Sequence, residues 1–415
     1  MRRWTRLMVV SAFAAAVGAA GADSRPTPPD LPPTALARES IDQDPAVVEA
    51  RRALIASRHA AEALRLGPHE WTTKLSAQRR RYDNAATSNE WTAALERTIR
   101  IGGKAEIDAR LADNELLLGQ ARIGEARQEA ARALSDLWID TLATARQREL
   151  WAEQLGFAQA SHDAVEKRRK AGDASMLDLN TARADLFEVQ RQLNAATTAQ
   201  AKAKAKLGVR FPALKYAAQP LAEPAELEMT LTQWRHRILA ESDPIKIADG
   251  QLKKAELSAA RFKADRIPDP TLGVYTASEA FRNERVIGIS LSMPLSGSYR
   301  SERSQQALQE VEAARAKVDR QRRDEESEIV EAYVEATGAL ARWRLASQGL
   351  SATRDNARLT QRAYALGEAD LQSLLLSRRQ ALDAATAAEQ ARVEALRWHY
   401  RLLVDAHLIW ALADD

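Results

Sequence analysis

Histidines are the first residues to test for acid–base or metal chemistry, and the sequence has six, at positions 59, 69, 162, 236, 399 and 407. No pair has the H-x-x-x-H spacing that places two imidazoles on one helix face. The absence of cysteine excludes disulfides, thiol catalysis and thiolate metal sites. Gly102-Gly103-Lys104 lacks the first glycine and the Ser/Thr of a phosphate-binding loop. We therefore predict no enzyme, no metal site and no cofactor.

Glycine and capping residues recur in one order in two stretches, AGDASMLDL at residues 171–179 and LGEADLQSL at residues 366–374. Gly172 and Gly367 suit the left-handed conformation that ends a helix. Ser175 and Asp370, three residues later, suit the cap of the next helix. Each stretch, called a tip below, therefore predicts a reversal between two helices. Apolar residues expected to be exposed there either pack on the neighbouring tip or dock a partner: Met176, Leu177, Leu371 and Leu374.

Long helices must position these tips. All fourteen prolines lie at or before Pro294, and none lies between Pro68 and Pro212. Because proline breaks helices and these two regions are rich in Ala, Leu, Arg, Gln and Glu, they favour helix. They predict helices at residues 103–170 and 298–366, each roughly 100 Å long at about 1.5 Å per residue. Helices of that length are typical of coiled coils.

The two halves of the chain follow one plan. Asp44-Pro45 and Asp243-Pro244 each open a short helix that ends before proline. The predicted order is a signal peptide at 1–22, a proline-rich segment at 23–43, a first repeat at 44–208, an equatorial connection at 209–242 and a second repeat at 243–415. Each repeat contains a helix, a β-hairpin (71–101 and 271–295), the long helix, a tip and a return helix (175–207 and 371–412).

The hairpins show the alternation of β-strands. In RVIGISLSMPL, residues 285–295, every second residue from Ile287 to Leu295 is apolar over about ten residues, the length of a strand in a membrane barrel. Residues 71–82 and 90–101 form a weaker pair, in which Arg97 falls in line with apolar residues. A soluble four-stranded patch is the alternative. Aromatic residues near the strand ends suit a membrane interface: Trp71, Tyr82, Trp91 and Tyr275.

The first 22 residues resemble a secretory signal, with Arg2, Arg3 and Arg6 before an apolar core and an Ala20-Gly21-Ala22 cleavage site. Without these three arginines, the 60 basic residues become 57 and equal the 57 acidic ones, so nothing favours nucleic acid. No later segment approaches 18 consecutive apolar residues, the length typical of a transmembrane helix. The mature chain is expected to be periplasmic, secreted or inserted in an outer membrane.

This arrangement resembles the TolC family of outer-membrane channels, the exit ducts of tripartite efflux pumps and type I secretion systems. The resemblance covers essentially the whole mature chain. The stretches RTIRIGGKAEIDAR (97–110) and SMPLSGSYRSERSQQA (292–307) resemble the CzcC-like heavy-metal efflux branch. The resemblance implies a mainly α-helical homotrimer in the outer membrane of a Gram-negative bacterium. Its long helices would form a periplasmic α-helical barrel, and four strands from each chain would form one twelve-stranded transmembrane β-barrel.

The resemblance also implies partners and roles for the tips. The partners are a periplasmic adaptor (membrane fusion) protein, an inner-membrane RND-type transporter and outer-membrane lipid. In the family, the tips form the periplasmic entrance, and polar bonds between tip helices hold it shut. The matching residues are Asp178, six after the first glycine, and Tyr364, three before the second, so a hydrogen bond between them is the expected gate. Alternatively, Asp178 caps its own helix.

Three residues depart from the family pattern at the entrance. Ser373 and Leu376 stand where family members often carry acidic residues, and Ala369 stands where they often carry arginine. This chain therefore departs from the family's acidic entrance ring and from part of its gate network. The residues expected to dock the adaptor are Gly172, Ser175, Met176, Leu177, Gly367, Asp370, Leu371 and Leu374.

The predicted function is a passive exit duct, with heavy-metal cations as the substrate that the CzcC-like stretches imply. The alternative is a periplasmic coiled-coil adaptor or scaffold of an export complex. An adaptor carries one helical hairpin between β-rich domains, whereas this chain has two hairpins and ends in a predicted helix. A soluble scaffold has no use for the alternating stretch RVIGISLSMPL.

Overall fold

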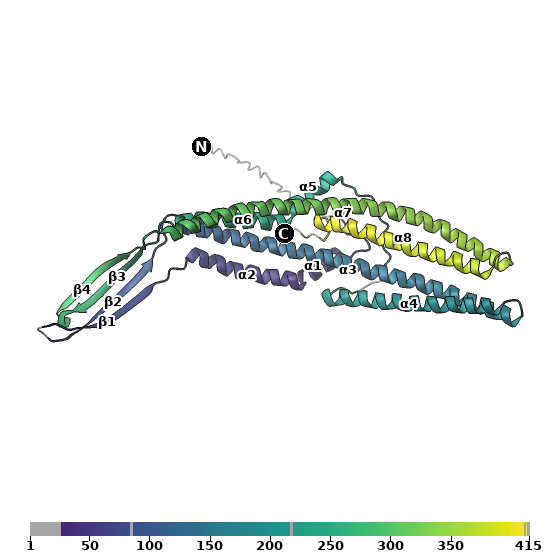
Figure 1. Cartoon of the computed structure of the whole chain (residues 1–415), viewed down its shortest axis with the longest axis horizontal. Helices are drawn as coiled ribbons and strands as arrows, with labels where there is room; N and C mark the ends of the chain where they lie inside the picture. The colour runs from purple at the N-terminus through teal and green to yellow at the C-terminus, as the bar shows by residue number, and fades with distance from the viewer. Residues whose placement is uncertain (1–25, 84–85, 216–218, 411, 413–415) are drawn as a thin grey trace, which may run out of the picture.

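The computed structural model describes residues 26–83, 86–215, 219–410 and 412, so the predicted signal peptide lies outside the described residues. The molecule is elongated, with a four-stranded sheet at one end and two helical tips at the other (Figure 1). Its elements in chain order are α1 (Thr34–Asp42), α2 (Pro45–Leu66), β1 (Thr72–Arg80), β2 (Ser88–Thr98), α3 (Lys104–Lys170), α4 (Met176–Arg210), α5 (Leu231–Glu241), α6 (Asp243–Ala264), β3 (Thr271–Glu279), the 3-10 turn η1 (Ala280–Arg282), β4 (Glu284–Ser292), α7 (Ser298–Leu366) and α8 (Leu371–Asp405).

The two long helices, α3 with 67 residues and α7 with 69, are each about 100 Å long and run from the sheet to the tips. Two shorter helices lie end to end along each of them, α2 and α4 on α3, and α6 and α8 on α7 (Figure 1). The matching helices have equal lengths of 22 and 35 residues, which reflects the repeated plan of the sequence. Contacts of α3 with α6 and α8 join the two halves.

The largest hydrophobic core lies at the waist, where both ends of the described chain meet the middle of α3. Trp138 donates its indole N–H to the Asp30 carbonyl at 2.7 Å, and the buried Tyr400 hydroxyl donates to the Asp30 carboxylate at 2.6 Å. Trp410 donates to the Pro32 carbonyl at 3.1 Å. These bonds satisfy buried polar groups and fix the N-terminal segment against the C-terminal one.

The C-terminal helix is shorter than predicted. The prediction extended it to residue 412, but α8 ends at Asp405. The chain then turns through positive φ angles at His407 and Trp410. Helix continuation would keep the following residues along the α8 axis, whereas the turn buries Leu408 and Trp410 in the waist core, where they are 2% and 1% exposed.

The sheet is antiparallel, in the order β1-β2-β3-β4, so β2 and β3 join the two repeats. β1 and β4 are its two edges. The predicted second hairpin reached residue 295, but β4 ends at Ser292, before Pro294. Proline has no N–H to donate to a ladder, which explains the earlier end. None of the helices in the described part of the chain has the length and apolarity that a membrane crossing requires.

Candidate functional site

One face of the sheet is apolar and has no cover within the described chain. Its central row aligns Leu95, Val274 and Ile289 across β2, β3 and β4. Ile289 is 86% exposed, although an isoleucine in a folded chain is normally buried. A contiguous apolar surface of this kind marks contact with another protein or with lipid. Its exposed large residues are Leu75, Trp91, Leu95, Leu272, Val274, Ile287, Ile289 and Leu291.

The opposite face is polar and hollowed. Lys74 forms an ion pair with Glu96 at 2.5 Å, and Gln78 donates to Glu90 at 2.8 Å across β1 and β2. A hollow of about 510 Å³ lies over this face. This face therefore presents paired polar and charged side chains around an open hollow, in contrast to the apolar face. The hollow is lined by Lys74, Leu75, Ser76, Thr92, Ala94, Glu96, Tyr275 and Ser290.

Three of the four aromatic residues expected at membrane interfaces lie toward the ends of the strands. Trp71 precedes β1, is 62% exposed and lies 5.5 Å from the guanidinium of Arg97. Trp91 lies on the apolar face, toward the opposite end of the sheet. Tyr82 follows β1 and stacks on Phe281 at 5.6 Å. Their contact with a membrane interface stays a prediction.

The expectation for Tyr275 is wrong. Tyr275 lies at the middle of β3, opposite Gly288, on the polar face. A Cβ at Gly288 would approach the Tyr275 ring to 2.5 Å. The missing side chain at Gly288 therefore lets the ring lie across the polar face.

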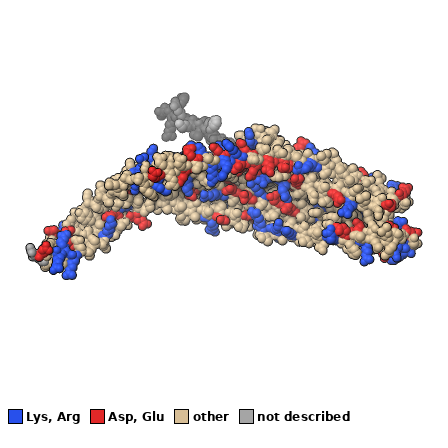
Figure 2. Space-filling model, viewed as in Figure 1, with Lys and Arg blue, Asp and Glu red and all other residues tan. Residues whose placement is uncertain are grey.

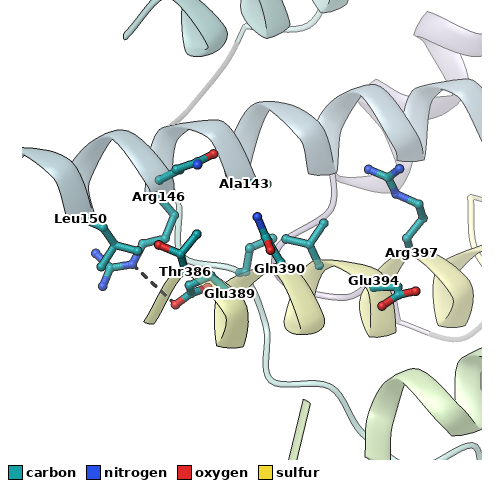
Figure 3. A pocket seen from close by; sticks show the side chains of 11 residues that line it. Ala143, Arg146, Leu150, Thr386, Glu389, Gln390, Glu394 and Arg397 are labelled. Carbon is teal, nitrogen blue, oxygen red and sulfur yellow. Dashed lines mark ion pairs between the residues drawn. The ribbon is translucent and has the colours of Figure 1, made fainter. Parts of the chain in front are cut away.

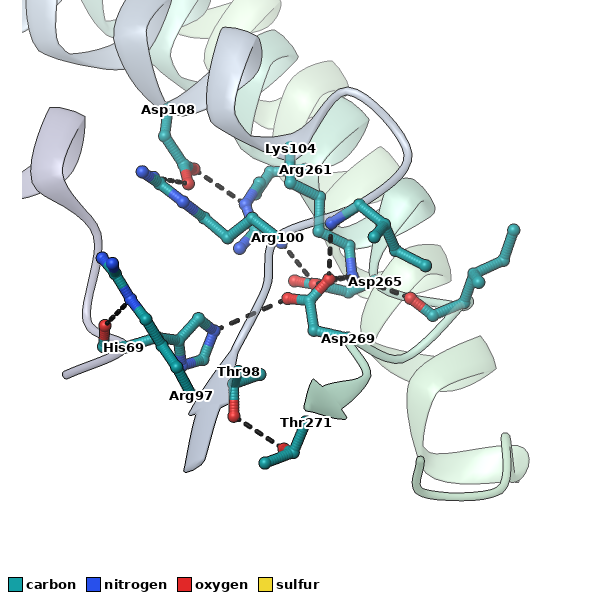
Figure 4. A network of polar contacts seen from close by, with 12 residues as sticks. His69, Arg97, Thr98, Arg100, Lys104, Asp108, Arg261, Asp265, Asp269 and Thr271 are labelled. Carbon is teal, nitrogen blue, oxygen red and sulfur yellow. Dashed lines mark hydrogen bonds and ion pairs between the residues drawn. The ribbon is translucent and has the colours of Figure 1, made fainter. Parts of the chain in front are cut away.

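A buried ionic network joins the sheet to the helices (Figure 4). Lys104, at the start of α3, is 1% exposed and donates to Asp269 and to the Ile267 carbonyl, both at 2.7 Å. Asp269 also accepts from the Ile101 N–H at 3.0 Å. Burial alone would raise the pKa of Asp269, but these hydrogen bonds and the positive charge of Lys104 hold that pKa below its ordinary value.

A second part of this network is centred on Asp108. Its carboxylate accepts from Arg100 at 2.8 Å and from Arg261 at 2.7 Å. Arg100 also donates to the carbonyls of Arg65 and Leu66 at the end of α2. We did not predict this network from the sequence. Arg100 and Asp108 are eight positions apart in the first repeat, but Arg261 and Asp269, which complete the network, lie in the second repeat.

The first tip has the cap that its sequence predicts. The Asp178 N–H donates to the Ser175 hydroxyl at 3.0 Å, and the Ser175 N–H donates to the Asp178 carboxylate at 3.0 Å. The Ser175 hydroxyl donates to the Asp178 carboxylate at 2.8 Å, and this bond, together with that from the Ser175 N–H, holds the pKa of Asp178 below its ordinary value. In the second tip, Asp370 accepts from the Ser373 N–H at 2.7 Å. Gly172 and Gly367 adopt φ angles of 89° and 80°.

Two of the four apolar tip residues are buried, which corrects the expectation that all four lie exposed. Leu371 and Leu374 are 5% and 3% exposed, and Leu371 packs with Val165 and Ala182 of the first hairpin. Being three residues apart, they share one helix face. Met176 and Leu177 are exposed, at 55% and 68%. Two further apolar residues missed by sequence reasoning are exposed at the second tip: Leu366 and Leu376.

The two expected gate residues have other partners within the described chain. Tyr364 accepts a hydrogen bond from Arg168 at 3.2 Å, and the Arg168 guanidinium lies 5.7 Å from the Tyr364 ring centroid. Asp178 is engaged with Ser175, and the charge of Arg168 also stabilises its carboxylate. Arg168 therefore connects the two hairpins and acts on both residues. It stands within the basic run of residues 167–170, which reads as a solvated helix end.

A cavity of about 220 Å³ lies between α3 and α8 (Figure 3). Each charged residue in its wall is already paired. Arg146 lies 3.6 Å from Glu389, Glu394 binds Arg342 at 3.0 Å, and Arg397 binds Asp140. The wall therefore presents two cations and two anions, which give a ligand no net charge to recognise. In the described part of the chain, no group of three or more His, Asp or Glu residues could hold a metal ion.

No protein-family model and no curated protein matches the sequence. Solved structures do match. The outer-membrane channel OprN aligns with a TM-score of 0.77 at 17% identity, over 91% of this chain and 90% of that chain. The outer-membrane protein VceC of Vibrio cholerae aligns with a TM-score of 0.74 at 17% identity, over 90% and 95%. The Campylobacter jejuni outer-membrane channel CmeC aligns with a TM-score of 0.71 at 14% identity, over 92% and 86%. The chain therefore has the fold of outer-membrane channel proteins, as its resemblance to the TolC family predicts.

Proposed function

We propose that the chain is one subunit of an outer-membrane exit duct, a passive channel that carries substrates from the periplasm to the exterior of a Gram-negative bacterium. The observation that carries this proposal is the sheet, with its bare apolar face, hollowed polar face and two open edges. Unpaired edge groups are not tolerated in lipid, and four strands do not close a barrel. Three chains would close one of twelve strands.

The helices would then form a periplasmic tunnel that ends at the tips. An adaptor protein would dock there and connect the duct to an inner-membrane RND-type transporter, which would supply the energy. Met176 and Leu177 at the first tip, and Leu366 and Leu376 at the second, are exposed apolar side chains available for docking. The buried Leu371 and Leu374 would support docking by holding the second tip in place. The other docking residues proposed from the sequence are Gly172, Ser175, Gly367 and Asp370.

Asp178 and Tyr364 would form the entrance gate, with Arg168 between them. Its hydrogen bond to Tyr364 and its charge near Asp178 support this assignment. The hydrogen bond from Arg168 to Tyr364 would hold the entrance shut by joining the two hairpins of each chain.

The duct is tested by its extraction and native mass. We expect the protein to need detergent for release from outer membranes and to have three times the mass of one chain. Ile289→Arg would place a charge in the apolar face and abolish this particle, because a charge at mid-membrane costs about 2–4 kcal/mol. Ser290→Arg is the matched control, since Ser290 lines the polar hollow and the particle should survive.

A detergent-independent monomer or dimer would contradict the duct. It would favour the periplasmic adaptor or scaffold, in which the apolar face meets protein. The same conclusion would follow if Ile289→Arg and Ser290→Arg behaved alike.

Heavy-metal cations are the substrates we propose, and the CzcC-like stretches at residues 97–110 and 292–307 support this choice. Deleting the gene should raise sensitivity to at least one of zinc, cobalt, cadmium, copper and silver. The wild-type gene should restore resistance, and the Ile289→Arg variant should not. Unaltered resistance to all five metals would exclude this substrate class while leaving the duct itself intact.

A further inference from the structure

Four arginines lie at the free end of the sheet, the end away from the helices, and all are exposed. In the described part of the chain, no hydrogen bond or ion pair engages their side chains. Figure 2 shows Lys and Arg side chains gathered at this end of the molecule. We call this group the arginine rim: Arg79, Arg81, Arg282 and Arg285.

At this end of the sheet, arginines of the rim lie on the apolar face and acidic residues lie on the polar face. Arg285 aligns with Ser278 and, across β3, with Trp91, so it belongs to the apolar face. Arg79, two residues after Ala77, belongs to the same face because strand side chains alternate. Of the acids at this end of the sheet, Glu90 and Glu279 lie on the polar face and pair with Arg80. Glu284 lies opposite Glu279 on the same face, and Asp83 lies in the turn after β1. In the described part of the chain, none of these four acids forms an ion pair with an arginine of the rim.

The turn that carries part of the rim is held in place. The Phe281 N–H donates to the Ser88 hydroxyl at 2.9 Å, and the Ala280 N–H donates to Glu90 at 3.3 Å. Phe281 also stacks on Tyr82, which follows Arg81. These contacts connect the η1 turn to the β1–β2 hairpin, so Arg282 and Arg81 come from segments fixed to one another.

Closure of a trimeric barrel, which rests on the proposed function, would bring arginines of neighbouring subunits together. Within one chain, Arg79 and Arg285 lie on opposite edge strands, about 14 Å apart at three strand spacings. When three copies close, β4 of one chain adjoins β1 of the next. Arg282 and Arg285 would then lie beside Arg79 and Arg81 of the partner subunit, giving one cluster of four arginines at each seam.

The chemistry of such a cluster selects phosphate. Arginine presents a planar fork of donors that fits phosphate oxygens in pairs, and the rim contains no lysine. Directly below it, Trp91, Leu75 and Ile287 offer an apolar surface for acyl chains. We propose that the arginine rim binds the phosphate groups of lipid A, the phosphorylated glycolipid of the outer leaflet, while its acyl chains lie on the apolar face.

The test compares binding of bisphosphorylated lipid A to the detergent-extracted wild type and to Arg79→Gln/Arg285→Gln. Native mass spectrometry should show binding weakened roughly tenfold or more in the variant, because one charged hydrogen bond contributes that much. Dephosphorylated lipid A should bind the wild type as weakly as phosphorylated lipid A binds the variant. The matched control is Arg320→Gln/Arg323→Gln, which removes two exposed arginines of α7 far from the sheet.

Several outcomes would overturn the proposal. Equal lipid A binding by wild type and rim variant would place the lipid elsewhere, and equal binding of dephosphorylated lipid A would exclude phosphate recognition. Displacement of lipid A by millimolar inorganic phosphate would indicate a general anion site. If the rim variant remains a detergent-dependent trimer but keeps its lipid affinity, only this inference fails. If the wild type is not such a trimer, the proposed function fails with it.

Discussion

Replacing Lys104 with methionine is expected to lower the local free energy of unfolding at the strand–helix junction by about 3–5 kcal/mol. Methionine fills a similar volume but leaves Asp269 without its ammonium partner at 2.7 Å. The lysine is 1% exposed, so water does not readily replace the lost partner. Hydrogen exchange of the amides at residues 97–108 and 261–271 measures this opening under native conditions.

Lys254→Met is the matched control for this measurement. Lys254 of α6 binds Glu115 of α3 at 2.8 Å, but its side chain is 51% exposed. An exposed ion pair contributes about 0–1 kcal/mol, so this variant should exchange nearly as slowly as the wild type. Equal effects of the two substitutions would contradict a special role for the buried network.

The pH dependence of exchange gives a second check on the same bond. Because the pKa of Asp269 is lowered below 3.8 in the folded chain, its stabilisation is complete above that pH. It should be lost as the pH falls further and the carboxylate is protonated. In Lys104→Met, burial acts on Asp269 without the opposing charge of the lysine, so the same amides should not show this loss at low pH.

The long helices could be predicted from the sequence because proline and glycine act locally. The two proline-free regions predicted α3 and α7, and Gly172 and Gly367 predicted where these helices end. The alternation in residues 285–295 likewise identified the apolar face of β4, since period two decides which side chains share a face. These features depend on residues only a few positions apart.

Features that depend on distant residues could not be predicted in this way. Lys104 meets Asp269 from 165 positions away, so neither residue signals the junction alone. The burial of Leu371 depends on Val165 and Ala182 in the other hairpin. The end of α8 depends on a waist core assembled from both termini, which only the complete fold brings together.

The gate shows the same division between local and distant information. The cap joins Ser175 and Asp178, which are only three residues apart, and the sequence predicted it as an alternative role for Asp178. The contact of Arg168 with Tyr364 joins residues 196 positions apart. Asp178 therefore caps its own tip helix, whereas Arg168 makes the contact with the other hairpin, and mutations must test the two residues separately.

Tyr364→Ala and Arg168→Ala are each expected to raise the single-channel conductance of the duct in planar bilayers. Each removes the hydrogen bond of 3.2 Å between the hairpins. Loss of an exposed bond to a charged group, about 0.5–1 kcal/mol, shifts an open–closed equilibrium roughly twofold to fivefold. Lys170→Ala is the control, because it removes a positive charge two residues away whose side chain is 73% exposed and paired only within its own helix turn, to Glu166.

Asp178→Ala should also open the entrance, and Ser175→Ala separates its two roles. Ser175→Ala removes the hydroxyl of the cap, which costs about 1 kcal/mol, but leaves the carboxylate facing Arg168. If Asp178 acts as a gate through charge, Ser175→Ala should leave the conductance low while Asp178→Ala raises it. If both raise it equally, Asp178 acts only by holding the tip helix. Unchanged conductance in both Asp178→Ala and Tyr364→Ala would exclude the gate.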